Sequence, residues 1–347
     1  MRRTVSYLCF ACILIAAVVF GMKAANRSIP PTGVQVEGDA IVVYDSEIGF
    51  VPRPNSTSHR TYFGPDGKPL LAYHLYTDRL GARVSHPGEQ TPDHVDLLFV
   101  GDSFTWGHGV ENPETFAAST TSALGLTGAN LAMGSYGTTQ ALQMLRRNRD
   151  LKPRLIIYST NPVQPIRNIR PCAPSYDPFC LDYSYIAWDW SGRAYIAPPR
   201  SDGVKRMQLQ RQSEKTGLDF LPGIMHDADV MMGRITAWAA QRTDPARQDP
   251  ALEYLIGQMV RTANDMNASL LVTYIPMGST PAPDILGRLA SQFGFRFLDL
   301  SPAFAEAERL SSSPPLYIPN DGHPSAAGNA LIARELVRFI QEKKILP

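Results

Sequence analysis

The sequence has little cysteine, little net charge and no repeats, and each shortage excludes a class of protein. Only 4 of its 347 residues are cysteine, too few for a fold held together by disulfides. Its 33 basic and 32 acidic residues leave a net charge of +1, so we expect no nucleic-acid partner. No internal repeat or low-complexity tract is found, and the chain is long enough for one large domain or two small ones.

Long apolar runs are also lacking, with one exception near the N-terminus. Residues 5–22, VSYLCFACILIAAVVFGM, carry no charge and follow Arg2 and Arg3. This length lies between a signal-peptide core and a membrane span. Lys23 disfavours cleavage after Ala25, so we favour an uncleaved signal anchor in residues 1–23 over a cleaved signal peptide. Both interpretations predict an exported protein, periplasmic or extracytoplasmic, and the anchor would hold it in the inner membrane.

The four cysteines agree with export. Two of them lie inside the apolar run, and Cys172 and Cys180 lie in the loop-like stretch RPCAPSYDPFCLDY. An oxidising compartment predicts a disulfide between Cys172 and Cys180. Metal binding is the alternative, but no second Cys or His pair is near in the sequence, so no metal is expected.

The remaining chain divides by pattern into three parts. Residues 24–94 indicate a linker followed by an N-terminal β-rich decoration, and residues 95–347 form the main domain, with an insertion or lid at 163–247. In the main domain strands alternate with helices. We expect strands at 96–101, up to 131, 154–160, 269–277 and 295–300, and helices at 114–125, 138–150, 250–267, 283–294 and from 325. Five such units predict an α/β fold with a central parallel sheet covered on both faces.

The stretch LLFVGDSF raises the question of what Ser103 does. Residues 97–100 indicate a buried strand, Gly101 a break, and Asp102 or Ser103 the start of a helix. A side chain on such a strand-to-helix turn stands at the carboxyl edge of the sheet, where parallel sheets carry their functional residues. Ser103 is therefore either a nucleophile or an ordinary N-cap serine, and one turn does not decide between them.

A serine nucleophile needs a base, and His323 lies where one is required, just before the last helix. Asp321, two residues earlier, can accept a hydrogen bond from the imidazole and orient it. The alternative is structural: Asp321 and Gly322 form a turn, and Pro324 and Ser325 start a helix.

Four segments together resemble the GDSL family, also called SGNH hydrolases. GDSFTWGHGVENPETF is similar to its first block, NLAMGSYGTTQAL to the second, and DGHPSAAGNALIA to the last, while Asn161 takes the place of the third-block asparagine. The resemblance implies a three-layer α/β/α flavodoxin-like fold. It also implies an acyl ester hydrolase or acyltransferase that uses no metal or organic cofactor.

The resemblance also implies roles for individual residues. Ser103 would be the nucleophile, His323 the base and Asp321 its orienting acid. The oxyanion hole would consist of the Ser103 N–H, a backbone N–H in the second block and the Asn161 amide. The second-block donor falls at Gly134 or Ser135, because the family's glycine aligns with Ser135. Pro162 also departs from the family, which has an acid after the asparagine.

The spacing Asp-x-His resembles the superfamily branch associated with O-acetylation of exported polysaccharides. We therefore expect an acyl-ester substrate, acetyl esters of an envelope or secreted polysaccharide being the leading candidates. One alternative is a lipid-directed esterase, such as a lysophospholipase or thioesterase. The other is a non-catalytic carbohydrate-binding or assembly component on the same scaffold.

Other polar and aromatic residues near the blocks receive structural interpretations first. We expect His108 to flank the pocket and Asp102 to cap or brace the turn. Arg167 and Arg170 would either contact an anionic substrate or belong to a solvated loop, the solvated loop being favoured. Trp188 and Trp190 would either line a sugar-binding lid or pack within the core or lid.

Overall fold

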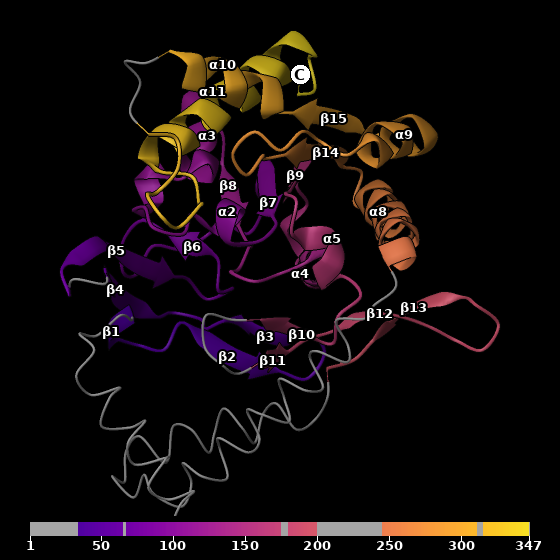
Figure 1. Ribbon diagram of the computed structural model, residues 1–347, viewed down its shortest axis with the longest axis horizontal. Helices are drawn as coiled ribbons and strands as arrows, with labels where there is room; N and C mark the ends of the chain where they lie inside the picture. Colours follow the sequence, from indigo (N-terminus) through magenta and orange to yellow (C-terminus); the bar gives the residue numbers. More distant parts are fainter. Residues whose placement is uncertain (1–33, 65–66, 175–179, 200–244, 311–314, 347) are drawn as a thin grey trace, which may run out of the picture. The chain divides into compact units, whose positions relative to one another are not determined.

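The computed structural model describes residues 34–64, 67–174, 180–199, 245–310 and 315–346 (Figure 1). The apolar run 5–22 lies outside these residues, so the predicted anchor stays a prediction. Within the described ranges, no helix combines the length and the apolarity that crossing a bilayer requires.

A five-stranded parallel sheet is the centre of the fold, as the alternation of strands and helices predicts. Its strands, in chain order, are β7 (Leu97–Val100), β8 (Gly128–Asn130), β9 (Leu155–Thr160), β14 (Ser269–Tyr274) and β15 (Arg296–Asp299). They lie side by side in the order β8-β7-β9-β14-β15, and each neighbouring pair is parallel. This is the flavodoxin-like order, in which the chain reverses its direction of travel between β7 and β9.

Both faces of the sheet are covered, and its strands β7 and β9 are buried at every position. In β7 all four side chains are buried, and Leu97 and Phe99 join a core cluster with α3, α10 and α11. On the other face lie α4, α8 and α9 (Figure 1). These helices span Phe116–Leu124 (α3), Thr138–Arg147 (α4), Gln248–Asp265 (α8), Asp284–Phe293 (α9), Ser301–Arg309 (α10) and Ala326–Glu342 (α11). The three-layer arrangement predicted from the sequence is confirmed.

The helices follow the predicted positions, apart from α10. In α8 the predicted apolar face is buried, including Leu255 and Met259. The helix after Asn112-Pro113 begins with a 3-10 turn, Asn112–Glu114, and its end at Gly125 has a φ of 64°. No helix was predicted between the last strand and the last helix, whereas the structure has one at Ser301–Arg309, in which only Phe304 is buried.

The predicted insertion contains two antiparallel hairpins in its described part. One pairs β10 (Cys172–Pro174) with β11 (Cys180–Asp182), and the other pairs β12 (Tyr185–Trp188) with β13 (Ala194–Ala197). They adjoin the antiparallel pair β2 (Val42–Asp45) and β3 (Gly49–Pro52), since the Ser184 N–H donates to the Ile48 carbonyl oxygen at 3.0 Å. The ring of Phe50 also packs against Tyr136 and Tyr183, at centroid distances of 5.4 and 6.3 Å.

The chain divides into two compact units. The larger comprises residues 38–58 and 74–347 and holds every element of the site described below, together with β6 (Arg83–Val84). The smaller comprises residues 1–37 and 59–73; its described part contains β1 (Val34–Gly38) up to residue 37, most of β4 (Thr57–Phe63) and the start of β5 (Pro69–Thr77). In the smaller unit Tyr62 and Tyr73 stack with their ring centroids 6.1 Å apart.

Candidate active site

Ser103 lies on a one-turn helix, α2 (Ser103–Trp106), that begins where β7 ends. The N-cap of this helix is Asp102, whose Oδ1 accepts the Phe104 N–H at 3.0 Å. Asp102 therefore satisfies the helix start, and the Ser103 hydroxyl is not needed as a cap. Gly101 is required at the turn because a Cβ there would lie 2.2 Å from Thr105 Oγ1. Because Asp102 is the N-cap, the alternative of an ordinary N-cap serine at Ser103 is excluded.

His323 reaches the same edge of the sheet from the far end of the chain, just before α11. The position of this turn depends on Asn329, a side chain only 1% exposed. Asn329 Oδ1 accepts the Phe116 N–H of α3 at 3.0 Å, and its Nδ2 donates to the Pro324 carbonyl oxygen at 3.1 Å. Asn329 thus ties the His323 turn to α3. This role of Asn329 was not predicted, although an asparagine in the first turn of an apolar helix favours hydrogen bonds between its side chain and nearby backbone.

Ser103, His323 and Asp321 form one hydrogen-bonded chain. His323 Nε2 lies 2.7 Å from Ser103 Oγ, and His323 Nδ1 lies 2.5 Å from Asp321 Oδ1. The same Asp321 oxygen accepts the His323 backbone N–H at 3.1 Å, which fixes the short turn. With the Nδ1 proton directed at the carboxylate, Nε2 presents its lone pair to the hydroxyl. This arrangement can take a proton from Ser103 when the oxygen attacks a carbonyl carbon.

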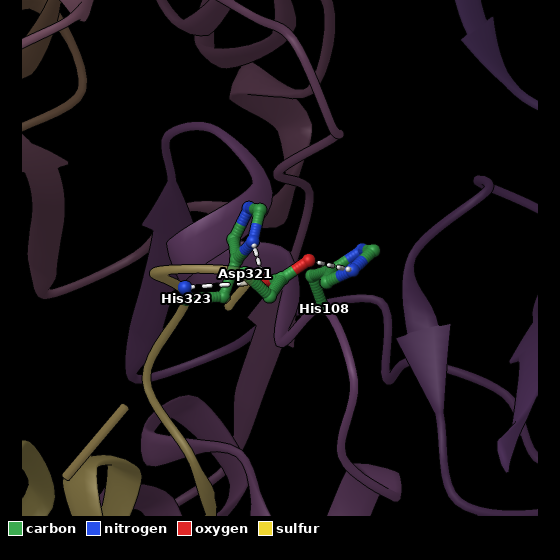
Figure 2. Close-up of side chains that lie close together, drawn as sticks. All are labelled: His108, Asp321 and His323. Carbon is green, nitrogen blue, oxygen red and sulfur yellow. Dashed lines mark hydrogen bonds and ion pairs between the residues drawn. The ribbon is translucent and has the colours of Figure 1, made fainter. Parts of the chain in front are cut away.

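A second imidazole, that of His108, faces the other carboxylate oxygen of Asp321 (Figure 2). His108 Nε2 is 3.5 Å from Asp321 Oδ2. Burial alone raises the pKa of the Asp321 carboxyl, but the bonds and charges of His108 and His323 outweigh it. Together they hold that pKa well below its usual range. Asp321 is therefore an ionised acceptor at neutral pH and keeps the His323 proton on Nδ1.

The same three side chains could in principle offer a metal one ligand atom each, all within 4.8 Å of one another. The donor atoms around a four-coordinate zinc ion, each about 2.1 Å from the metal, lie about 3.4 Å apart. The 2.5 Å between His323 Nδ1 and Asp321 Oδ1 is instead the length of a strong hydrogen bond. The geometry therefore fits a proton relay better than a ligand set.

Asn161, directly after β9, faces the turn that carries Ser103. Its Nδ2 donates to Asp102 Oδ2 at 2.7 Å, and Arg167 Nη1 donates to the same oxygen at 2.9 Å. Arg167 Nη1 also donates to the Tyr136 carbonyl oxygen at 3.0 Å. Because a carboxamide carries two N–H groups, Asp102 can fix the Asn161 amide while its second N–H serves a ligand oxygen.

The expectation of a solvated loop at Arg167 is wrong. Arg167 closes the short helix α5 (Gln164–Arg167), and its side chain, 19% exposed, forms an ion pair with Asp102, which is 1% exposed. A buried carboxylate is tolerated only where an opposite charge and hydrogen bonds compensate it. Arg167 supplies that charge beside the nucleophile turn, and Asp102 braces the turn as expected.

The loop after β8 brings a further backbone segment to Ser103. The Met133 N–H donates to the Gly101 carbonyl oxygen at 3.3 Å, and a Cβ on Gly134 would lie 4.0 Å from Ser103 Cβ. Ser135 has a φ of 66°, in the left-handed region that favours glycine. The serine thus adopts a backbone conformation that glycine reaches freely, at a cost of about 1 to 2 kcal/mol.

The tryptophans of the insertion have different surroundings. Trp190 is 99% exposed in the turn between β12 and β13, so core packing is wrong for this residue. Trp188 lies under the Arg247 guanidinium, whose central carbon is 5.0 Å from the ring centroid.

The predicted disulfide falls partly outside the described structure. The side chains of Cys172 and Cys180 are not described, although their backbones are. Cys172 pairs with Asp182 and Cys180 with Pro174, so the cysteines lie two positions apart along the hairpin. The disulfide stays a prediction.

Comparison with solved structures shows likeness of fold. The chain is similar in fold to GDSL-family proteins. One is described as a lipolytic protein of the G-D-S-L family from Desulfitobacterium hafniense, with 13% identity, coverage of 70% of this chain and 97% of that chain, and a TM-score of 0.38. An acetylxylan esterase from Geobacillus stearothermophilus has 13% identity, coverage of 73% and 95%, and a TM-score of 0.39.

A carbohydrate esterase family 2 enzyme with a carbohydrate-binding domain, from Corynascus thermopiles, has 13% identity, coverage of 89% and 99%, and a TM-score of 0.42. No protein-family model matches the sequence, and no curated protein matches it either. At these identities and TM-scores, the activities of the GDSL-family structures are not evidence for the activity of this chain. The function is therefore argued from the site itself.

Proposed function

We propose that this chain is a GDSL-type serine ester hydrolase in which Ser103 attacks the acyl carbonyl. The observation that carries this proposal is the bonded chain Ser103–His323–Asp321, built from residues 220 positions apart at the carboxyl edge of the sheet. A structural role for the Asp321 turn alone would not require a 2.7 Å contact between His323 Nε2 and Ser103 Oγ.

The reaction follows from the positions of the protons. His323 Nε2 takes the hydroxyl proton as Ser103 Oγ bonds to the carbonyl carbon, and ionised Asp321 stabilises the imidazolium that forms. Collapse of the tetrahedral intermediate breaks the ester C–O bond, and His323 returns the proton to the leaving alcohol. Water then attacks the acyl-enzyme, again through His323, and releases the acid and free Ser103.

The negative oxygen of the tetrahedral intermediate needs fixed donors. The candidates are the Ser103 N–H, a backbone N–H of Gly134 or Ser135, and the second N–H of Asn161 Nδ2. They come from the ends of β7, β8 and β9, which meet at this edge of the sheet. Loss of one such donor lowers kcat by about 100- to 1,000-fold.

The substrate proposed is a short acyl ester, acetyl first, on an envelope or secreted polysaccharide. Its support lies in the sequence: the Asp-x-His spacing, and a charge-free run at residues 5–22 that would export the chain and anchor it in the inner membrane. A sugar hydroxyl in place of water would make the protein an acyltransferase with the same triad.

The experiment is hydrolysis of p-nitrophenyl acetate, butyrate and octanoate by the full-length chain and by Ser103→Ala. Circular dichroism confirms that both are folded. We expect turnover of the acetate ester by the wild type and none above background for the variant. Equal rates in both proteins would refute the nucleophile, and a preference for octanoate would favour lipid esters.

Transfer and location have tests of their own. Addition of oligosaccharide acceptors, with mass spectrometry of the products, distinguishes transfer to sugar from hydrolysis. If carbonate washing releases the intact full-length chain from membranes, the anchor is refuted. Carbohydrate binding that is unchanged in Ser103→Ala, without turnover of any ester, would favour a binding component.

A further inference from the structure

The carboxylate of Asp321 lies between two imidazoles, although the proposed reaction uses only one. Its Oδ1 accepts from His323 Nδ1 at 2.5 Å, while its Oδ2 lies 3.5 Å from His108 Nε2. Figure 2 shows each ring directed at a different oxygen of the carboxylate. The side chains of His108 and Asp321 are only 11% and 20% exposed, so bulk water does not dominate this contact.

His108 is firmly held in this position. Its backbone N–H donates to the Ser103 carbonyl oxygen at 3.0 Å, which links it to the nucleophile. The loop after α2 is bound by Arg83, which donates through Nη1 to the carbonyl oxygens of Trp106 and Gly107 at 2.6 and 2.5 Å and through Nη2 to that of Val110. These hydrogen bonds fix the loop that carries His108.

His108 also limits the movement of the base. The rings of His108 and His323 have centroids 4.2 Å apart, and the Phe104 ring lies 5.1 Å from the His323 ring. An imidazole in contact with two neighbouring rings has little freedom to rotate away from Ser103. Restriction of this kind matters because small displacements of a catalytic group lower rates steeply.

We propose that His108 is a positioning residue, which holds Oδ2 of Asp321 so that Oδ1 stays directed at His323. A carboxylate held at one oxygen only can rotate about its Cβ–Cγ bond and exchange the oxygen that faces His323. With both oxygens engaged, the rotation is blocked and His323 keeps one ring orientation. This inference rests on the proposed function, because it concerns the orientation of the proposed base.

The test compares two substitutions in the full-length protein. His108→Leu fills the space without an N–H donor, whereas in His108→Gln the side-chain amide can take the place of Nε2. We expect His108→Leu to lower kcat for p-nitrophenyl acetate about tenfold, within the range of coupling between contacting residues. KM should stay within about twofold, because His108 acts on the base rather than on substrate binding. His108→Gln should retain most of the wild-type kcat.

A double-mutant cycle shows whether His108 acts through Asp321. In an Asp321→Asn background, His108→Leu should cause no further loss of kcat. The matched control is His86→Leu, at a histidine whose side chain is 69% exposed, and it should leave kcat unchanged. Thermal unfolding of every variant separates loss of kcat from loss of fold.

Several outcomes would overturn the inference. These are an unchanged kcat in His108→Leu, equal losses in the Leu and Gln variants, a loss confined to KM, and an undiminished loss in the Asp321→Asn background. Inactivation of the wild type by a chelator, reversed by added zinc, would also overturn it in favour of a metal site. Failure of the proposed function gives a different result, since Ser103→Ala would then retain full turnover.

Discussion

Replacement of Arg167 by methionine tests the electrostatics around the nucleophile turn. The substitution keeps most of the side-chain volume and removes the charge that faces buried Asp102. At the 2.9 Å separation of Arg167 Nη1 and Asp102 Oδ2, the attraction is of order 6 kcal/mol for an effective dielectric constant of about 20. Most of it offsets the desolvation of the two ions, so the net effect of the substitution is smaller.

Two magnitudes follow for Arg167→Met. Removal of one partner from a buried pair destabilises by about 3 to 5 kcal/mol. For Arg167→Met we expect the free energy of unfolding to fall by about 3 kcal/mol, because the Arg167 side chain is 19% exposed and water can reach the remaining charge. We expect kcat to fall about 10- to 100-fold, below the full loss of an oxyanion donor, because Asp102 then holds the Asn161 amide less firmly.

The assays are urea unfolding and kcat for p-nitrophenyl acetate, with Arg193→Met as the control at an arginine 84% exposed. Addition of Asp102→Asn to Arg167→Met should recover at least half of the lost stability, since the uncompensated charge is gone. It should not recover kcat, because the carboxylate that accepts from Asn161 is also gone. Wild-type stability and kcat in Arg167→Met would refute the reasoning, and so would a double variant no more stable than Arg167→Met.

Three further predictions concern pH and packing. The pKa of Asp321 is lower in the folded protein than in the unfolded chain, so its stabilisation is complete above about pH 4 and is lost as the pH falls. Between pH 6 and pH 3 the urea midpoint should therefore fall more for the wild type than for Asp321→Asn, and equal falls would contradict this. Burial and the charge of Asp299 raise the pKa of Tyr274 to about 12, so the stability that this group contributes below about pH 10 is lost as the pH rises toward 12. The urea midpoint of Tyr274→Phe should therefore fall less over this range than that of the wild type, and an equal fall would count against the reasoning. A Cβ on Gly328 would lie 2.1 Å from the Leu316 carbonyl oxygen, so Gly328→Ala should lower both Tm and kcat. The control Gly287→Ala, where the added methyl group meets open space, should lower neither. A wild-type Tm in Gly328→Ala would refute the clash.

The order of strands and helices could be predicted because the parallel sheet is buried on both faces. Stretches such as residues 97–100 and 155–158 are then continuously apolar, and this pattern can be recognised from the sequence alone. The helix α10 could not be predicted, since its burial rests on Phe304 and on contacts with distant segments. The strands of the insertion were equally hard to place, because β10–β11 and β12–β13 are short two-stranded pairs, and the segment between the pairs bonds to Ile48, more than a hundred residues earlier.

The candidate site shows the same division between local and distant information. Ser103, Asp321 and His323 were found from local motifs and strand-end positions. The roles of Arg167 and Asn329 depend on hydrogen bonds to Asp102 and to the Phe116 N–H, 65 and 213 residues away. His108 was expected to flank the pocket, but its distance from Asp321 depends on how the turn before α11 folds back.

The separation of Ser103 from His323 has a consequence for synthesis. The proposed nucleophile and its proposed base are 220 residues apart, and Asn329, which ties the His323 turn to α3, follows His323 in the chain. A nascent chain that has already formed β7 and α2 carries a serine with no base beside it. On the proposed mechanism, reactivity therefore begins only once the segment from His323 onward has been made and α11 has docked on α3. A fragment that ends before His323 would leave Ser103 without its proposed proton acceptor, so we expect it to be inert.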